Sequence, residues 1–199
     1  MASKDLRKRD IWQNISGSLA LDAEKAFEMS FKYAFQETNY ELIPKPKNFK
    51  KIYVDFPLSE ETKNEIYNPD IEIKTHGISP DYAIKNKTNN KTLFIEVKRQ
   101  DGWVEGKPRS AGRGNAHERS CKYFTPGLLK ILREESGIQD SSLPFWTVFI
   151  GDITRDPCRV REITCWFDTY EEHFFMWRKK NEPKKLVDHF DFHLKHLLD

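Results

Sequence analysis

The sequence contains two short apolar stretches joined by a polar turn, and this pattern limits the folds that the 199-residue chain can adopt. The first strand is expected over residues 81–85 and the second over 92–98, with turn-forming Asn and Lys residues between them. So short a connection indicates an antiparallel hairpin. Farther along, residues 145–150 form an uninterrupted apolar run, which is typical of a strand buried on both faces. The chain is therefore predicted to form a sheet that needs helices to cover it.

The spacing of apolar residues predicts the remaining elements. Helical spacing indicates a first helix over residues 22–37, and Ser59 is placed to cap a short helix over 59–66. Further strands are expected over 52–56, 71–74 and 173–177, and further helices over 116–123, from 126 onward, over 160–167 and along Leu186, Phe190, Leu194 and Leu197. The predicted fold class is α/β, a mixed β-sheet flanked by helices, in a single domain over residues 1–199.

Composition excludes several classes of protein. With 38% apolar and 13% aromatic residues the chain can bury a core, so wholesale disorder is excluded. No apolar run approaches the roughly 20 residues of a membrane helix. The charged start of the chain predicts no secretory signal peptide. Three cysteines without a CxxC pair predict reduced thiols, neither a disulfide framework nor a cysteine zinc site, and hence a cytoplasmic protein.

The distribution of charge is uneven although the net charge is only +2. Residues 97–133 hold nine basic and three acidic side chains, so the rest of the chain is acidic in balance. A basic segment in an otherwise acidic protein suggests a polyanionic partner such as nucleic acid. A solvated basic loop explains the charge alone equally well.

The predicted hairpin carries residues suited to metal-assisted chemistry. Glu96 and Lys98 lie two apart on one strand, so both side chains point to the same face, and Asp81 opens the neighbouring strand. Two carboxylates beside a lysine suit Mg²⁺, which is held by one or two carboxylates with substrate phosphate and water. An ordinary charged surface hairpin is the simpler interpretation of the pattern alone. The functional one gains weight because both charges interrupt an apolar strand and a basic, glycine-rich stretch follows at once.

A second motif lies in that stretch, over residues 111–120. Its glycines permit close approach to a ligand. Asn is suited to adenine and Arg to guanine in the major groove, and Glu118 can accept from a base amino group. Asn115 as a helix cap with Glu118 at its third position is the purely structural interpretation. The two interpretations are compatible, because a capped helix end can deliver such side chains to DNA.

Taken together, these motifs resemble those of a known protein family. Pro80-Asp81, then Glu96-Val97-Lys98, then Gly114-Asn115-Ala116-x-Glu118-Arg119 resembles the EcoRI-like type II restriction endonucleases of the PD-(D/E)xK superfamily. The stretch from Lys98 to Cys121 is similar to a branch of this family that cuts CAATTG. The resemblance implies a restriction-endonuclease-like core and a Mg²⁺-dependent homodimer that cuts both strands of double-stranded DNA after the first C of CAATTG. The cognate DNA methyltransferase is implied as the partner enzyme of the system.

The resemblance also implies roles for residues. Asp81, Glu96 and Lys98 would be catalytic, with the metal held by both carboxylates and the backbone carbonyl of Val97. Base recognition is assigned to Arg113, for the outer C·G pair, and to Asn115, Ala116, Glu118 and Arg119, for the inner AATT. Further candidates for contact with DNA are Lys107, Arg109, Gly112, Gly114 and His117.

Two other functions remain open at this stage. A structure-specific nuclease of repair or recombination would share the hairpin but lack a base-reading motif, so residues 114–119 argue against it. A non-catalytic DNA-binding module would have lost part of the catalytic set, and all three residues are present.

Overall fold

A computed structural model describes residues 22–66, 71–101, 117–139, 141–179 and 182–199 of the chain. In it, a five-stranded mixed sheet runs through the molecule in the order β1-β2-β3-β4-β5. Strands β1 (Tyr40–Pro44), β2 (Tyr82–Asn86) and β3 (Thr92–Arg99) are antiparallel neighbours, whereas β4 (Phe145–Ile150) and β5 (Phe174–Trp177) run parallel to β3. The predicted hairpin is confirmed, because β2 pairs with β3 in register from Tyr82 opposite Ile95.

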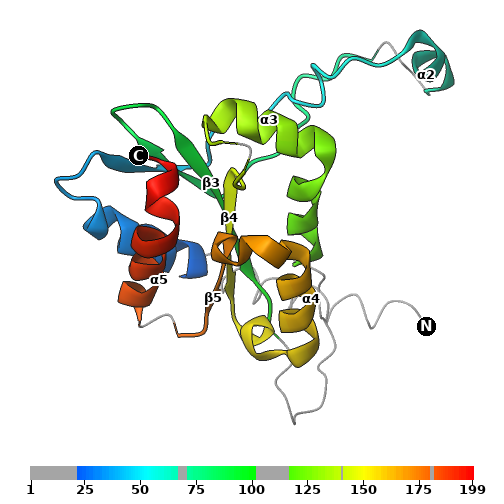
Figure 1. The fold of residues 1–199 in the computed structure, drawn as a ribbon. Coiled ribbons are helices and arrows are strands. Elements are labelled where there is room, and N and C mark those ends of the chain that lie inside the picture. Colours follow the sequence, from blue (N-terminus) through cyan, green and yellow to red (C-terminus); the bar gives the residue numbers. More distant parts are fainter. Residues whose placement is uncertain (1–21, 67–70, 102–116, 140, 180–181) are drawn as a thin grey trace.

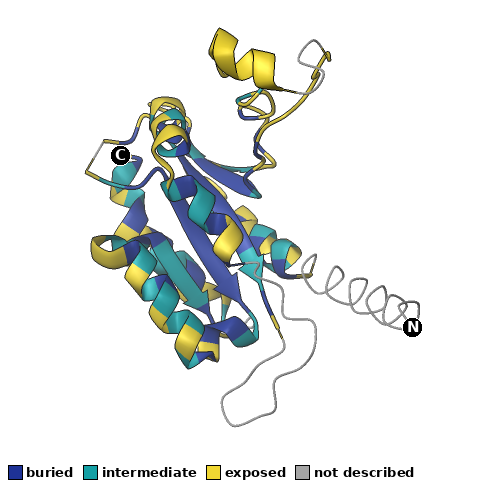
Figure 2. Ribbon diagram, turned by 90° about the vertical axis from the view of Figure 1, so that its right-hand side faces the viewer, coloured by how far each residue is buried: buried dark blue, intermediate teal, exposed yellow. Residues whose placement is uncertain are grey.

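Helices cover both faces of the sheet (Figure 1). The helix over 22–34 and α5 (Pro183–His189) share one apolar cluster with the sheet. Helices α3 (Pro126–Ser136) and α4 (Pro157–Phe167) share the other, together with η1, a 3₁₀ helix over Glu118–Phe124. All six residues of β4 are buried between these layers, as predicted from its apolar run (Figure 2).

Alternation along β3 decides which face receives the catalytic candidates. Leu93, Ile95 and Val97 belong to the core under the 22–34 helix, whereas Phe94 packs into the core under α3 and α4. Because side chains alternate between faces, Glu96 and Lys98 lie on the α3 and α4 side.

The ends of the helices on that side have clear local causes. Helix α3 begins with Pro126 in its first turn and ends at Gly137, whose φ of 67° is left-handed. Helix α4 begins after Asp156, whose side chain accepts from the backbone N–H groups of Cys158 and Arg159. Such caps fix where each helix meets the sheet.

Two predicted strands are wrong, and one strand escaped prediction. Residues 51–56 form turns and bends, and residues 71–74 pair with no strand among those described. The alternating apolar residues of these two stretches therefore do not belong to the sheet. Both stretches lie near the short helix α2 (Glu60–Glu65), which projects from the body and begins at the predicted cap Ser59 (Figure 1). Strand β1 was missed because Pro44 indicated a loop. An edge strand tolerates proline at its end.

The other predicted elements are present with shifted ends. The first helix ends at residue 34 rather than 37, and the C-terminal helix continues from α5 through a π-helical turn, Phe190–Leu194, and a 3₁₀ turn, Lys195–Leu197. The helix expected over 116–123 is η1. Within the parts of the chain that the structure describes, none of the helices has the length and apolar character needed to cross a membrane.

Candidate active site and DNA-recognition segment

The β2–β3 hairpin brings Asp81, Glu96 and Lys98 together. Because Tyr82 faces Ile95, the preceding Asp81 comes opposite Glu96 at the open end of the hairpin. One oxygen of Asp81, Oδ2, accepts a hydrogen bond of 2.8 Å from the backbone N–H of Val97 and lies 3.7 Å from Nζ of Lys98. The same Nζ forms an ion pair with Oε1 of Glu96. All three side chains therefore converge on one point, as the sequence predicted.

The site is only partly open to solvent. The side chains of Lys98 and Asp81 are 16% and 20% exposed, and Glu96 is buried. Burial of the carboxyl group and the neighbouring Glu96 carboxylate raise the pKa of Asp81 to about 6, although Lys98 acts in the opposite direction. Two close carboxylates thus carry more negative charge than one lysine offsets.

Tyr123 is a member of the site that sequence reasoning did not find. Its hydroxyl group donates a 2.9 Å hydrogen bond to Oε2 of Glu96, and its ring is buried under α3 and α4. Burial and the Glu96 carboxylate raise the pKa of Tyr123, so the phenol stays protonated as a donor. Tyr123 lies 27 residues from Glu96 in the sequence, and no sequence motif predicts that these two side chains meet.

The donor set fits a hard divalent cation. Carboxylate oxygens are the ligands that Mg²⁺ prefers, and the excess negative charge between Asp81 and Glu96 favours a cation there. The described residues contain no cluster of three or more His, Cys, Asp or Glu placed to hold a metal. A two-carboxylate site matches a cation whose other ligands come from substrate and water. The carbonyl of Val97 stays a predicted ligand.

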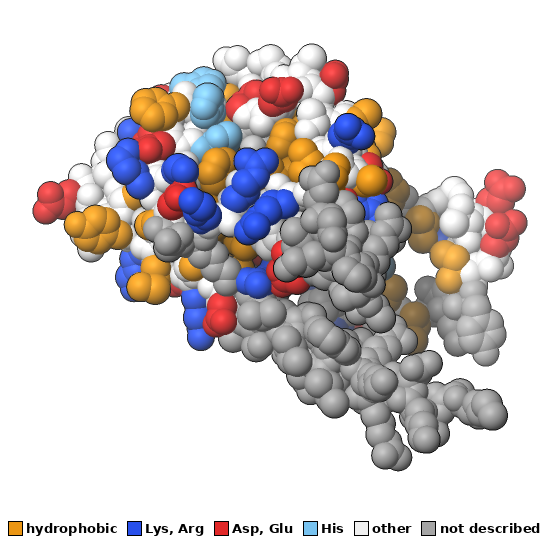
Figure 3. Space-filling view, turned by 90° about the horizontal axis from the view of Figure 1, so that it is seen from below, with side chains coloured by type: hydrophobic (Ala, Val, Ile, Leu, Met, Phe, Trp, Pro, Cys, Tyr) orange, Lys and Arg blue, Asp and Glu red, His pale blue; other side chains and the backbone are white. Residues whose placement is uncertain are grey.

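The structure describes only the end of the motif that is predicted to read bases. The predicted residues Lys107, Arg109, Gly112, Arg113, Gly114, Asn115 and Ala116 lie outside the described residues. Glu118 and Arg119 begin η1 and are exposed, so both side chains are accessible to a partner. Lys and Arg side chains also gather on the face seen in Figure 3.

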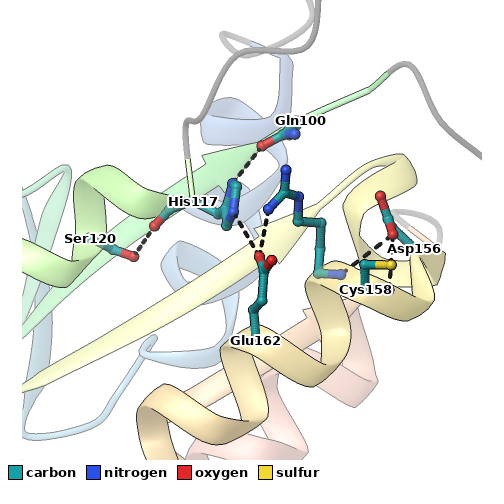
Figure 4. A network of polar contacts seen from close by, with 7 residues as sticks. Gln100, His117, Ser120, Asp156, Cys158 and Glu162 are labelled. Atoms are coloured by element: carbon teal, nitrogen blue, oxygen red, sulfur yellow. Dashed lines mark hydrogen bonds and ion pairs between the residues drawn. The ribbon is translucent and has the colours of Figure 1, made fainter. Parts of the chain in front are cut away.

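His117 does not lie where a direct DNA contact requires. Its side chain is fully buried, its ring stacks on Trp166 with centroids 5.5 Å apart, and its Nδ1 lies 2.9 Å from Oε1 of Gln100 (Figure 4). Burial and the Arg159 guanidinium lower the pKa of His117, which favours the neutral ring. The structure thus assigns His117 to packing beneath the surface, in place of the expected contact with DNA.

Near the end of the chain, His189 is held by an aromatic neighbour and by a backbone carbonyl group. His189 stacks on Trp146 with centroids 5.6 Å apart, and its Nε2 lies 2.7 Å from the carbonyl oxygen of Glu172. His193 and His196 are exposed on the same segment.

Comparison with known proteins connects this geometry to a family. A family model described as type II restriction enzyme MunI matches residues 1–199. The type II restriction enzyme MunI of a Mycoplasma species is 52% identical over 202 residues, covering 100% of both chains. This chain belongs to the MunI family of type II restriction enzymes. The crystal structure of MunI restriction endonuclease in complex with cognate DNA matches with a TM-score of 0.81 and 52% identity, over 94% of this chain and 97% of that chain.

Membership of the MunI family confirms two predictions. The predicted family, the type II restriction endonucleases, is the right one. The predicted fold class is also right, because the mixed sheet flanked by helices is shared with the MunI endonuclease structure.

Proposed function

We propose that this endonuclease cuts both strands of DNA at CAATTG, after the first C, with Mg²⁺ as its cofactor. Four-base 5′ overhangs would result. The observation that carries the proposal is the convergence of Asp81, Glu96 and Lys98 at the open end of the hairpin, directly before the base-reading motif. The 52% identity to the type II restriction enzyme MunI over the whole chain supports cutting at a specific site.

Each residue of the hairpin would have its own role in phosphodiester hydrolysis. Asp81 and Glu96 would hold Mg²⁺, which when bound lowers the pKa of water and offsets charge on the transition state. Lys98, held between the two carboxylates, orients the attacking water and stabilises the negative charge that develops on the scissile phosphate. Tyr123 fixes one oxygen of Glu96.

Specificity would come from the segment that follows. Arg113 would contact the guanine of the outer C·G pair, and Asn115, Ala116, Glu118 and Arg119 would read the inner AATT. The exposure of Glu118 and Arg119 supports this role. Lys107 and Arg109 in the same segment would contact phosphates, which adds affinity without sequence information.

We infer a homodimer as the acting form. Each chain supplies one catalytic hairpin for one strand, and a palindrome is read most simply by a two-fold symmetric protein. Light scattering at micromolar concentration should give twice the 23.6 kDa chain mass. A monomeric mass with double-strand cutting retained would contradict the dimer.

Such an enzyme would act in the cytoplasm beside a DNA methyltransferase that protects the same site in the host. Three free cysteines suit a reducing compartment. Expression without a methyltransferase of matching specificity should therefore be toxic to cells whose genome contains the site.

The central test uses purified protein, a long duplex of mixed sequence and Mg²⁺, followed by sequencing of the fragment ends. Discrete fragments ending in 5′-AATT are expected, with no cutting in EDTA or by the Lys98→Ala variant. A smear would indicate an unspecific or structure-specific nuclease, and binding without cutting would indicate a DNA-binding module.

A further inference from the structure

A buried histidine lies directly beside exposed residues that the proposed function assigns to base reading. His117 is fully buried, whereas Glu118 and Arg119 next to it are exposed at the start of η1. Burial of an imidazole is costly unless its polar atoms find partners. The partners of His117 therefore indicate what this position is for.

Two elements hold the imidazole from opposite sides (Figure 4). On one side, its Nδ1 lies 2.9 Å from Oε1 of Gln100. On the other side is α4, where Trp166 stacks on the ring at an interplanar angle of 12°. Oε2 of Glu162 lies 3.4 Å from Nε2, which is buried and makes no hydrogen bond within the described part of the chain. Nη1 of Arg159 donates a 2.6 Å hydrogen bond to the same oxygen, which fixes the carboxylate.

Gln100 lies at the end of the strand that carries the proposed catalytic residues. It directly follows β3, four residues after Glu96, and is itself buried. Its backbone is fixed on both sides, because its N–H donates to Ile150 and its carbonyl accepts from Ile153, both at 3.1 Å. The contact between His117 and Gln100 thus ties the start of η1 to the end of the catalytic strand.

The contact also spans the base-reading segment. Gln100 precedes residues 102–116 and His117 follows them, so their side chains join the two ends of the stretch that contains Arg113 and Asn115. A bidentate contact with a base edge needs its donors placed to within about 0.5 Å. A fixed anchor next to Glu118 and Arg119 meets that need.

We propose that His117 is a specificity-positioning residue, which sets the place of the adjacent Glu118 and Arg119 relative to the end of β3 through its contacts with Gln100 and Trp166. The proposal rests on the proposed function, since it requires that Glu118 and Arg119 read bases. His117 touches no DNA in this role. Its loss should lower the ratio between cutting of the correct site and cutting of altered sites.

The test compares wild type with His117→Phe, which keeps an aromatic ring on Trp166 and removes the polar contact with Gln100. Single-turnover cleavage is measured on duplexes with the mapped wild-type site and on duplexes with one inner base pair changed. The ratio of the two rates should fall by roughly tenfold or more, about the value of one well-placed base contact. Because both rates come from the same preparation, the ratio does not depend on how much protein is folded.

His173 provides a matched control. It is also fully buried, its Nδ1 lies 2.9 Å from the carbonyl oxygen of Phe145, and it lies at the opposite end of β4 from Ile150. His173→Phe removes a comparable buried contact and should lower stability while leaving the cleavage ratio at its wild-type value. An equal fall in the ratio for both variants would show a general loss of order and overturn the proposal.

A second variant approaches the same contact from β3. Gln100→Met keeps the length of the side chain and removes its polar end, so it should reproduce the loss of discrimination even if His117→Phe does not fold. The double variant should be no worse than either single one, because both remove one shared interaction. Additive losses, or an unchanged ratio in Gln100→Met, would contradict the anchor.

The outcomes separate this inference from the proposed function. Wild-type protein that cuts all duplexes equally would refute the base-reading assignment itself. Strong discrimination by wild type that persists unchanged in His117→Phe would refute only the role of His117.

Discussion

The catalytic hairpin and the segment that follows it are positioned by different physical means. Asp81, Glu96 and Lys98 are placed by strand register, with backbone hydrogen bonds on both sides of β3. The η1 segment has no strand partner and is joined to β3 by side chains, His117 at its start and Tyr123 near its end. Register is fixed by many cooperative bonds, whereas each of these ties depends on one contact.

The difference predicts separable defects. A change in the hairpin should affect the rate of cutting and leave the choice of site intact. A change in the base-reading segment should affect the choice of site first. Variants at Tyr123, which joins η1 to Glu96, then show how far the function of one region depends on the other.

The largest effect is expected from Glu96→Gln, which keeps the shape of a metal ligand and removes its charge. Cleavage in Mg²⁺ should fall by roughly a thousandfold or more, about 4 kcal/mol of transition-state stabilisation. Site preference, measured as competition binding in Ca²⁺, should remain, because the residue contacts no base. Loss of preference together with cutting would show that the two regions are not separable.

Arg113→Ala is the converse change. Loss of a bidentate contact to the outer guanine removes roughly 1–3 kcal/mol of discrimination per half-site, and two independent half-sites double the loss. Binding should then depend on AATT alone, measured with duplexes that vary only in the outer pair. Lys98→Ala serves as the control that stops cutting and keeps the preference. If Arg113→Ala still separates C·G from G·C like wild type, Arg109 and Arg119 are the next candidates for the outer pair.

The same contrast explains what the sequence could predict. The hairpin, the buried strand β4 and the convergence of Asp81, Glu96 and Lys98 follow from period-two alternation and a short turn, which are local signals. The ties of Tyr123 to Glu96 and His117 to Gln100 join residues far apart in sequence, and one sequence holds no signal for such pairs. The strands expected over 52–56 and 71–74 failed for a related reason, because alternation does not say whether a partner strand is near.

Asp81→Asn tests the charge balance inside the hairpin. Burial and Glu96 raise the pKa of Asp81 from an ordinary 3.8 to about 6, so the folded state binds a proton more tightly than the unfolded state. Stability of the metal-free protein is therefore lost as the pH rises from about 4 through 6. Asparagine lacks this cost and still accepts from Val97, so the variant should be more stable than wild type by about 2 kcal/mol above pH 6.

The measurement is a series of urea unfolding curves in EDTA from pH 4 to pH 7.5 for both proteins. The difference between them should shrink toward zero at the acid end. Titration of groups away from the hairpin, such as buried His173 with its pKa lowered to about 4, is common to both proteins and cancels. A difference that does not vary with pH would mean that Asp81 is not strained by its surroundings.

The smallest effect is expected from Tyr123→Phe, at the contact between η1 and Glu96. The change removes one hydroxyl group from a buried ring and leaves Oε2 of Glu96 without that donor, so the carboxylate gains freedom to turn away from the metal. Cleavage should slow by roughly tenfold, in line with about 1.5 kcal/mol for a hydrogen bond to a charged group.

Tyr40→Phe is the matched control, because its phenol also donates to a carboxylate, that of Asp199, at the far edge of the sheet. If the regions are separable, Tyr123→Phe changes the rate and keeps the ratio between correct and altered sites. If that ratio falls as well, η1 carries the position of Glu96 to the base-reading residues, and register alone does not isolate the catalytic hairpin.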